Sequence, residues 1–248
     1  MKLLKLLIFP ACILLLAVGT AKGASRFQTN SFKTSEGPLA ITFPGHASLM
    51  MHFRGKYIYI DPWSKVADFS KMPKADIIFI TNQHKDHFDL KAIKELSDDN
   101  TLVVLPEICA MRYREGMVMK NGDVKVIRGL KVRCVPAYNI VDISPAGFPY
   151  NFKGIGNGYV IDFGDKRVYI AGDTEKIPAM NQLGHIDIAF LPVGLPDAMP
   201  LQMAADAVRT IKPAVFYPYR YGDANVARLK AMLKDLPGTE VRIISTMK

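Results

Sequence analysis

The stretch T-N-Q-H-K-D-H at residues 81–87 places three potential metal ligands, His84, Asp86 and His87, within four residues. The four residues before it are apolar and predict a buried strand, and those after it predict a helix, so the ligands lie on the loop between two elements. Imidazole and carboxylate groups suit zinc or another first-row metal. Because binding residues concentrate on loops that a rigid scaffold positions, the sequence predicts a metal site at this strand end.

Short strands dominate the pattern on both sides of this loop. Apolar or alternating runs predict strands at 39–43, 48–53, 57–60, 77–80, 102–105, 124–127, 132–135, 158–163, 167–171, 186–191, 215–217 and 241–244. Helical spacing predicts helices at 90–96, 107–114, 201–211 and 224–236. Hairpin turns recur and no linker divides the halves, so the pattern favours an α+β fold with a two-layer sheet sandwich flanked by helices.

Further motifs follow one another in a fixed order along the chain. They are G-H-A-S at 45–48, I-D-P at 60–62, V-P-A-Y-N at 135–139, G-N-G-Y-V-I at 156–161, Y-I-A-G-D-T at 169–174, L-P-V at 191–193 and Y-P-Y-R-Y-G-D at 217–223. Together with 81–87 they resemble the metallo-β-lactamase superfamily, in the branch of metal-dependent hydrolases related to ascorbate-phosphate lactonase. The resemblance covers about 38–246 and implies a four-layer αββα sandwich.

The resemblance also implies a set of metal ligands. In that family two adjacent metal sites share a bridging aspartate. The positions that match the family's ligands are His84, Asp86, His87 and Asp173, the last being the bridge. The positions where the family has histidine and this chain does not are Asn82, Asn151 and Arg220, with Asn139 as an alternative alignment for Asn151. The chain has no histidine between His87 and His185 that could replace them.

These departures leave two interpretations of the site. Asparagine is a poor ligand for a transition metal, so the first site is expected to be empty. Asp86, His87 and Asp173 would suffice for a single zinc or manganese ion with water. Alternatively, the permanent charge of Arg220 pairs with the aspartates and replaces the metal charge in a metal-free salt-bridge network.

Two hypotheses about function follow. The first is a hydrolase that uses at most one divalent metal and a water molecule, with Asp86 holding the metal or orienting the water, to cleave a small ester, lactone or phosphoester. The second is a catalytically inactive relative whose cleft binds an anionic small molecule or a protein partner. His46 and Asp61 are expected beside the site, either supporting the ligands from behind or as a structural histidine and a turn-capping aspartate.

The N-terminus predicts export. Residues 1–23 combine early lysines, a 13-residue apolar run and small residues, the order of a signal peptide, with an uncleaved anchor as the alternative. Cleavage would leave 24–248 as one domain, periplasmic or secreted, with no membrane span. The net charge of +9 falls to about +6 without the three lysines of this segment. Basic residues are scattered and form no nucleic-acid motif, so a small, anionic ligand is expected rather than DNA or RNA.

Two cysteines follow the predicted cleavage site, Cys109 and Cys134. They are not spaced as a metal-binding pair, and two are too few for a disulfide framework. Export would permit a bridge between them. Cys134 lies in an apolar strand pattern, so a buried free thiol is the alternative.

Overall fold

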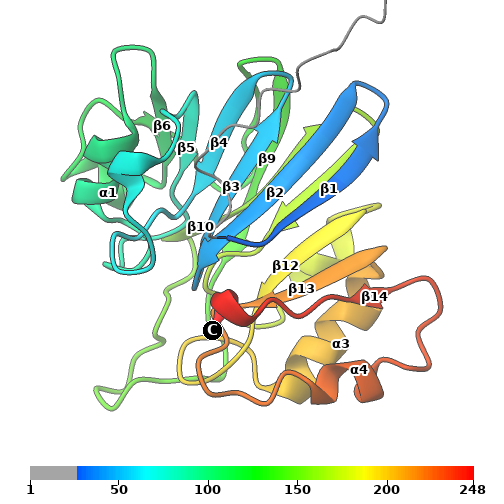
Figure 1. Cartoon of the computed structure of the whole chain (residues 1–248). Coiled ribbons are helices and arrows are strands. Elements are labelled where there is room, and N and C mark those ends of the chain that lie inside the picture. The colour runs from blue at the N-terminus through cyan, green and yellow to red at the C-terminus, as the bar shows by residue number, and fades with distance from the viewer. Residues whose placement is uncertain (1–26) are drawn as a thin grey trace, which may run out of the picture.

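The computed structural model describes residues 27–248, in which two seven-stranded sheets pack face to face with helices on their outer sides (Figure 1). The predicted signal peptide at 1–23 lies outside the described residues. Within 27–248 no helix is long and apolar enough to cross a membrane. The predicted α+β class, a four-layer αββα sandwich, is confirmed.

The first sheet follows the chain order. Its strands are β1 (Thr29–Thr34), β2 (Gly37–Gly45), β3 (Ser48–Phe53), β4 (Lys56–Ile60), β5 (Ile77–Phe79), β6 (Leu102–Leu105) and β7 (Met117–Val118). Strands β1 to β4 pair antiparallel, as expected for strands joined by tight turns, and β4 to β7 pair parallel. The parallel half therefore brings the carboxyl ends of β4 and β5 to one edge of the sandwich.

The second sheet repeats this scheme. Its strands are β8 (Val124–Ile127), β9 (Leu130–Ala137), β10 (Gly156–Phe163), β11 (Lys166–Ile170), β12 (Ile188–Pro192), β13 (Val215–Tyr219) and β14 (Glu240–Val241). Strands β8 to β11 pair antiparallel, and β11 to β14 pair parallel. The carboxyl ends of β11, β12 and β13 consequently lie side by side.

Alternation along the strands explains the layers. In β5, Ile77 and Phe79 belong to the central core between the sheets, whereas Ile78 belongs to a separate core under helix α1. The helices are α1 (Leu90–Leu96), α2 (Glu107–Ala110), α3 (Leu201–Ile211) and α4 (Arg228–Met232), with short 3₁₀ turns η1 (Phe69–Lys71), η2 (Pro178–Gln182) and η3 (Ser245–Met247). Helix α1 begins at the cap Asp89, whose carboxylate accepts two backbone N–H groups.

Several predicted boundaries were wrong. The predicted helices 107–114 and 224–236 shrink to α2 and α4, because much of their flanks is held by tight i→i+3 turns such as Gly116 N to Tyr113 O and Leu236 N to Leu233 O. The last strand is β14, earlier and shorter than the predicted 241–244. Strand β1 was not predicted, because it is an edge strand with a half-exposed, polar sequence that pairs through its backbone with β2.

The two cysteines lie in different cores. Cys109 is buried under α1 and Cys134 is buried between the sheets, and both are free thiols in the described part of the chain. The disulfide alternative is therefore not realised.

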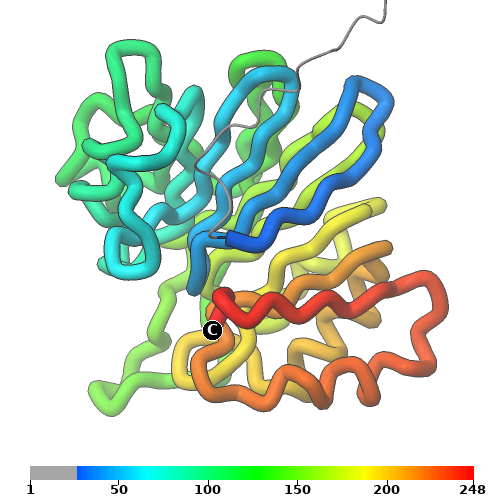
Figure 2. Tube along the Cα trace, viewed as in Figure 1, coloured from blue at the N-terminus to red at the C-terminus, as the bar shows by residue number. Residues whose placement is uncertain are grey.

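Figure 2 shows the C-terminal end of the chain returning to the turn after β2, where the Thr246 carbonyl accepts a hydrogen bond from His46 N at 3.0 Å.

Candidate metal centre

The centre is built at the edge where the carboxyl ends of the parallel strands meet. Asp61, the residue after β4, accepts hydrogen bonds from Thr81 N at 2.8 Å and Thr81 Oγ1 at 2.6 Å, which fix the start of the 81–87 loop. The same carboxylate lies 2.8 Å from Nδ1 of His87. Asp61 and His87 are fully buried, so this contact fixes both the ring and its tautomer.

The other ring nitrogen of His87 points into the centre. Nε2 lies 3.0 Å from Asp173 Oδ2 and 3.6 Å from Asp86 Oδ2, yet it makes no well-formed hydrogen bond to any residue in 27–248. Burial lowers the pKa of His87, but the charges of Asp173 and Asp61 outweigh burial and raise that pKa well above its usual range. A buried imidazole between carboxylates therefore holds a proton or faces a cation.

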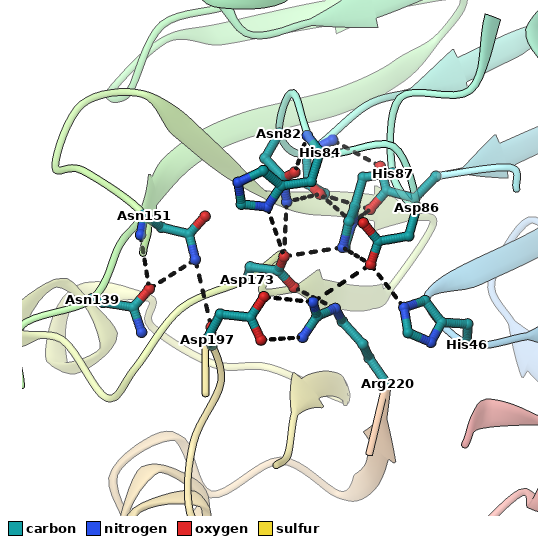
Figure 3. A network of polar contacts seen from close by, with 12 residues as sticks. His46, Asn82, His84, Asp86, His87, Asn139, Asn151, Asp173, Asp197 and Arg220 are labelled. Carbon is teal, nitrogen blue, oxygen red and sulfur yellow. Dashed lines mark hydrogen bonds and ion pairs between the residues drawn. The ribbon is translucent and has the colours of Figure 1, made fainter. Parts of the chain in front are cut away.

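Arg220, at the end of β13, lies on the opposite side of the centre (Figure 3). Its Nε is 3.1 Å from Asp173 Oδ1, and its Nη2 is 3.4 Å from Asp86 Oδ2. Its Nη1 and Nη2 lie 2.8 and 2.7 Å from the two carboxylate oxygens of Asp197. Despite burial, Asp173 and Asp197 raise the pKa of Arg220, and the charges of His87 and Arg220 hold the pKa of Asp173 well below its usual range.

His46 and His84 complete the ring of titratable side chains. Nε2 of His46 lies 2.9 Å from Asp86 Oδ2, and Nδ1 of His84 lies 3.6 Å from Asp173 Oδ2. Burial raises the pKa of Asp86, but the His46 hydrogen bond and the neighbouring charges outweigh it and bring that pKa below its usual range. The structure thus brings together all four predicted ligands, with His46 beside them.

The asparagines at the altered positions form two separate sets of hydrogen bonds, one around Asn82 and one between Asn139 and Asn151. Asn82 Nδ2 lies 3.2 Å from Asp173 Oδ2, and its side-chain oxygen accepts His84 N at 2.8 Å. Asn151 Nδ2 donates to Asn139 Oδ1 at 2.7 Å and to the Asp197 carbonyl at 3.5 Å. These amides satisfy one another and their loops, so they hold the backbone rather than offering a ligand set for a second metal.

Two residues of the centre were missed from the sequence. Asp197 stands alone in the loop after β12, and only the parallel pairing of β12 with β13 places it beside Arg220. Glu175 is fully buried, and its carboxylate accepts three successive backbone N–H groups, of residues 140–142, at 2.6–2.8 Å. Their place in the sequence could have indicated them, because each follows a strand of the parallel half of the second sheet, at the edge where the site lies.

Three residues of the centre adopt the left-handed backbone region. They are His46 (φ 55°), Asp61 (φ 44°) and Arg220 (φ 51°). For side chains with a Cβ this region carries a strain of about 1–3 kcal/mol each, and such residues cluster at functional sites. The backbone of the centre is therefore held in place by its surroundings, which include a hydrogen bond from Arg220 N to the His46 carbonyl at 3.2 Å.

The side chains present fit a single cation. The centre gathers four carboxylates: those of Asp86, Asp173 and Asp197 contact the Arg220 guanidinium, and that of Asp61 contacts His87. Buried negative charge in such excess requires a counter-charge, from protonated histidines or from a metal ion. The donor atoms that face the centre are imidazole nitrogen and carboxylate oxygen, the ligand types of zinc and manganese.

The centre opens into a pocket of about 670 Å³. The centre contributes His46, Asp197 and Arg220 to its lining, and the rest comes from the loops at 194–201 and 221–224, which add the charged residue Asp223. Much of this remaining wall is apolar, as is common for sites that bind small molecules. A ligand in the pocket would therefore contact the face of the centre formed by His46 and Arg220.

Residues 40–220 match the family described as beta-lactamase superfamily domain. The chain belongs to this family. It is 28% identical over 223 residues to a UPF0173 metal-dependent hydrolase of Pelotomaculum thermopropionicum, covering 84% of this chain and 97% of that protein. It is 30% identical to a UPF0173 metal-dependent hydrolase of Thermoplasma acidophilum, covering 81% of this chain and 92% of that protein.

Solved structures agree with this assignment. A protein of Parabacteroides distasonis, described as a candidate metal-dependent hydrolase, shares 44% identity and a TM-score of 0.84, covering 88% of this chain and 98% of its own. The metallo hydrolase Igni18 of Ignicoccus hospitalis has a TM-score of 0.69 over 85% of this chain and 96% of its own. At 22% identity the second likeness concerns the fold alone.

Proposed function

We propose that this protein is a metal-dependent hydrolase that uses at most one divalent metal ion, held by Asp86, His87 and Asp173. The observation that carries the proposal is the orientation of His87: Asp61 holds Nδ1, and the buried Nε2 faces the carboxylates of Asp173 and Asp86, at 3.0 and 3.6 Å. A ring fixed from behind by a carboxylate is the usual arrangement of a metal-bound histidine. The names of the relatives from Pelotomaculum and Thermoplasma support the same activity.

Asp173 and Asp86 would have different roles in hydrolysis. When bound, zinc or manganese would supply Lewis-acid activation of a water nucleophile. Asp173 is fully buried and fixed by Arg220, so it holds position, whereas Asp86 is partly exposed and can orient a water molecule. The pocket of about 670 Å³ suits a small ester, lactone or phosphoester. Arg220 already contacts three aspartates, so recognition of an anionic substrate would need a cation other than Arg220.

One observation favours a second candidate function. Arg220 contacts Asp86, Asp173 and Asp197 at 2.7–3.4 Å, which is the salt-bridge network expected of a relative without metal. In that case the pocket would bind a ligand or partner without cleaving it. The two candidates differ in whether the centre binds a metal and hydrolyses a substrate.

The test uses residues 24–248, stripped with a chelator and reloaded with Zn²⁺ or Mn²⁺. We expect hydrolysis of a p-nitrophenyl ester, a lactone or a phosphodiester that appears only after reloading and that Asp173→Asn abolishes. His185→Ala serves as the control, because this histidine is exposed and contacts only Asp187. A protein that binds no metal on reloading and hydrolyses none of these substrates would favour the second candidate.

We also propose that the protein is exported to the periplasm or beyond, on the sequence pattern of residues 1–23. Expression of the full chain in a bacterium followed by cell fractionation tests this. The expected product is found in the periplasmic fraction or the medium and begins near residue 24. A full-length product that stays with the membranes would support the uncleaved anchor instead.

A further inference from the structure

We propose that His46 is a direct ligand of the metal and supplies the imidazole that the centre lacks because Arg220 occupies a histidine position. The inference rests on the proposed metal-dependent function. It adds His46, from the turn between β2 and β3, to the proposed ligands Asp86, His87 and Asp173, the last of which lies 3.0 Å from His87 Nε2.

The donor atoms of these residues converge. Nε2 of His46, Nε2 of His87 and a carboxylate oxygen of Asp86 all lie within 4.8 Å of one another. Asp86 Oδ2 is the shared neighbour, 2.9 Å from His46 and 3.6 Å from His87. Figure 3 shows the His46 and His87 rings on either side of the Asp86 carboxylate. One ion of the size of zinc, with ligand distances of about 2.0–2.2 Å, fits between atoms at such separations.

A second group of converging donors is already satisfied. His84, Asp173 and Asp197 also offer atoms within 4.8 Å of one another. However, both carboxylate oxygens of Asp197 are bound by Arg220, at 2.8 and 2.7 Å. The guanidinium thus serves as the cation of this group. The guanidinium contacts the His46 group only through Asp86 Oδ2, at 3.4 Å, and makes no ion pair with His87, whose Nε2 faces Asp173 Oδ2 at 3.0 Å and Asp86 Oδ2 at 3.6 Å.

The backbone holds His46 where a ligand must be. His46 adopts φ 55°, a strained conformation that two hydrogen bonds maintain, from its own N to Thr246 O at 3.0 Å and from Arg220 N to its carbonyl at 3.2 Å. Its ring also lies against Trp63, with centroids 4.9 Å apart. The backbone at residue 220 and the C-terminal residues therefore hold the His46 ring beside Asp86 and His87.

A cysteine substitution shows whether His46 binds the metal or only donates a hydrogen bond to Asp86. The proposal predicts that His46→Cys loaded with Co²⁺ shows the intense thiolate-to-cobalt charge-transfer absorption of a coordinating thiolate. His185→Cys, at the exposed histidine outside the centre, shows none. If His46→Cys binds Co²⁺ without this absorption, the proposal is overturned.

An affinity measurement covers the case in which the cysteine variant does not fold. His46→Ala should bind Co²⁺ at least about 100-fold more weakly than wild type, beyond the 10–100-fold typical of a residue that only orients a ligand. His185→Ala should bind as wild type does. Wild-type affinity in His46→Ala overturns this inference and leaves the proposed function standing. A wild-type protein that binds no Co²⁺, Zn²⁺ or Mn²⁺ overturns both.

Discussion

Arg220 and Asp197 form a two-point ion pair in which Nη1 and Nη2 of the guanidinium lie 2.8 and 2.7 Å from the two carboxylate oxygens. This planar pairing is the strongest geometry available to arginine and carboxylate. It neutralises the charge that Arg220 brings into the centre. An arginine at a metal-ligand position is therefore compatible with a cation nearby, because a dedicated aspartate balances it.

Removal of Asp197 should destabilise the protein. Asp197→Ala leaves a largely buried guanidinium with unsatisfied donors, and we expect it to lower the free energy of unfolding by about 1–3 kcal/mol. This is less than the 3–5 kcal/mol of fully buried pairs, because the Asp197 and Arg220 side chains are 17% and 12% exposed. Urea denaturation measures the change, with Asp197→Asn as the isosteric comparison.

The control for this prediction is an exposed pair of the same type. Asp235 pairs with Arg209 at 3.1 Å on the surface, and Asp235→Ala should change stability little. A double-mutant cycle with Arg220→Met isolates the Asp197–Arg220 coupling. Equal effects of Asp197→Ala and Asp235→Ala would contradict the assigned role of the buried pair.

Asp61 should control metal affinity without contacting the metal. In Asp61→Asn, an amide N–H group facing His87 Nδ1 would favour the tautomer with the proton on Nε2, which cannot bind a metal. We expect metal affinity to fall by about 10–100-fold. Asp76→Asn is the matched control, since Asp76 accepts a backbone N–H from Tyr57 at 2.8 Å away from the centre. Calorimetric titration with Zn²⁺ checks this, and unchanged affinity in Asp61→Asn would refute it.

Gly172, the residue before Asp173, should not tolerate a side chain. It has φ 69°, and an added Cβ would lie 2.8 Å from the Asn157 carbonyl and 3.0 Å from Thr81 Cβ, where the two sheets meet below the centre. Gly172→Ala is expected to lower the free energy of unfolding by more than about 2 kcal/mol, because strain and overlap add. Gly55→Ala is the control: at φ 73° it brings the same backbone strain, but an added Cβ there would contact no neighbouring atom. Equal thermal denaturation midpoints for the two variants would contradict this account of the junction.

The two buried cysteines should be unreactive in the folded protein. Burial raises the pKa of both Cys109 and Cys134 to about 12, so at pH 8 both remain protonated thiols. Reaction requires the thiolate, and its fraction rises only as pH approaches the raised pKa. Titration of residues 24–248 with a disulfide reagent at pH 8 should label neither cysteine in the native state and both in guanidinium chloride. Rapid labelling of the native protein would show that a thiol is accessible.

Much of the fold could be predicted because it depends on local patterns. The strands with apolar alternation and helix α3 occur close to where periodicity placed them. In these elements the apolar residues of one continuous segment show which face packs against the core. Strand β1 could not be predicted, because its pairing partner rather than its own composition makes it a strand. The short α4 reflects turns that apolar spacing does not distinguish from helix.

The centre was predictable to the extent that its residues lie in motifs. The 81–87 loop and Asp173 meet because both follow strands that end at one edge. Asp197 could not be assigned to Arg220, because 23 positions separate them and only the pairing of β12 with β13 brings them together. The left-handed backbone of His46, which aims its ring at Asp86, is likewise set by contacts with the C-terminal residues and Arg220.

Metal stoichiometry of purified residues 24–248 tests the central claim most directly. After stripping, loading with Zn²⁺ or Mn²⁺ and removal of the free ion, elemental analysis should find about one metal per chain, because Asp86, His87 and Asp173 suffice for one ion. Asp173→Asn should reduce this value sharply. Less than roughly a tenth of a metal per chain in the wild type, or two metals per chain, would contradict the account.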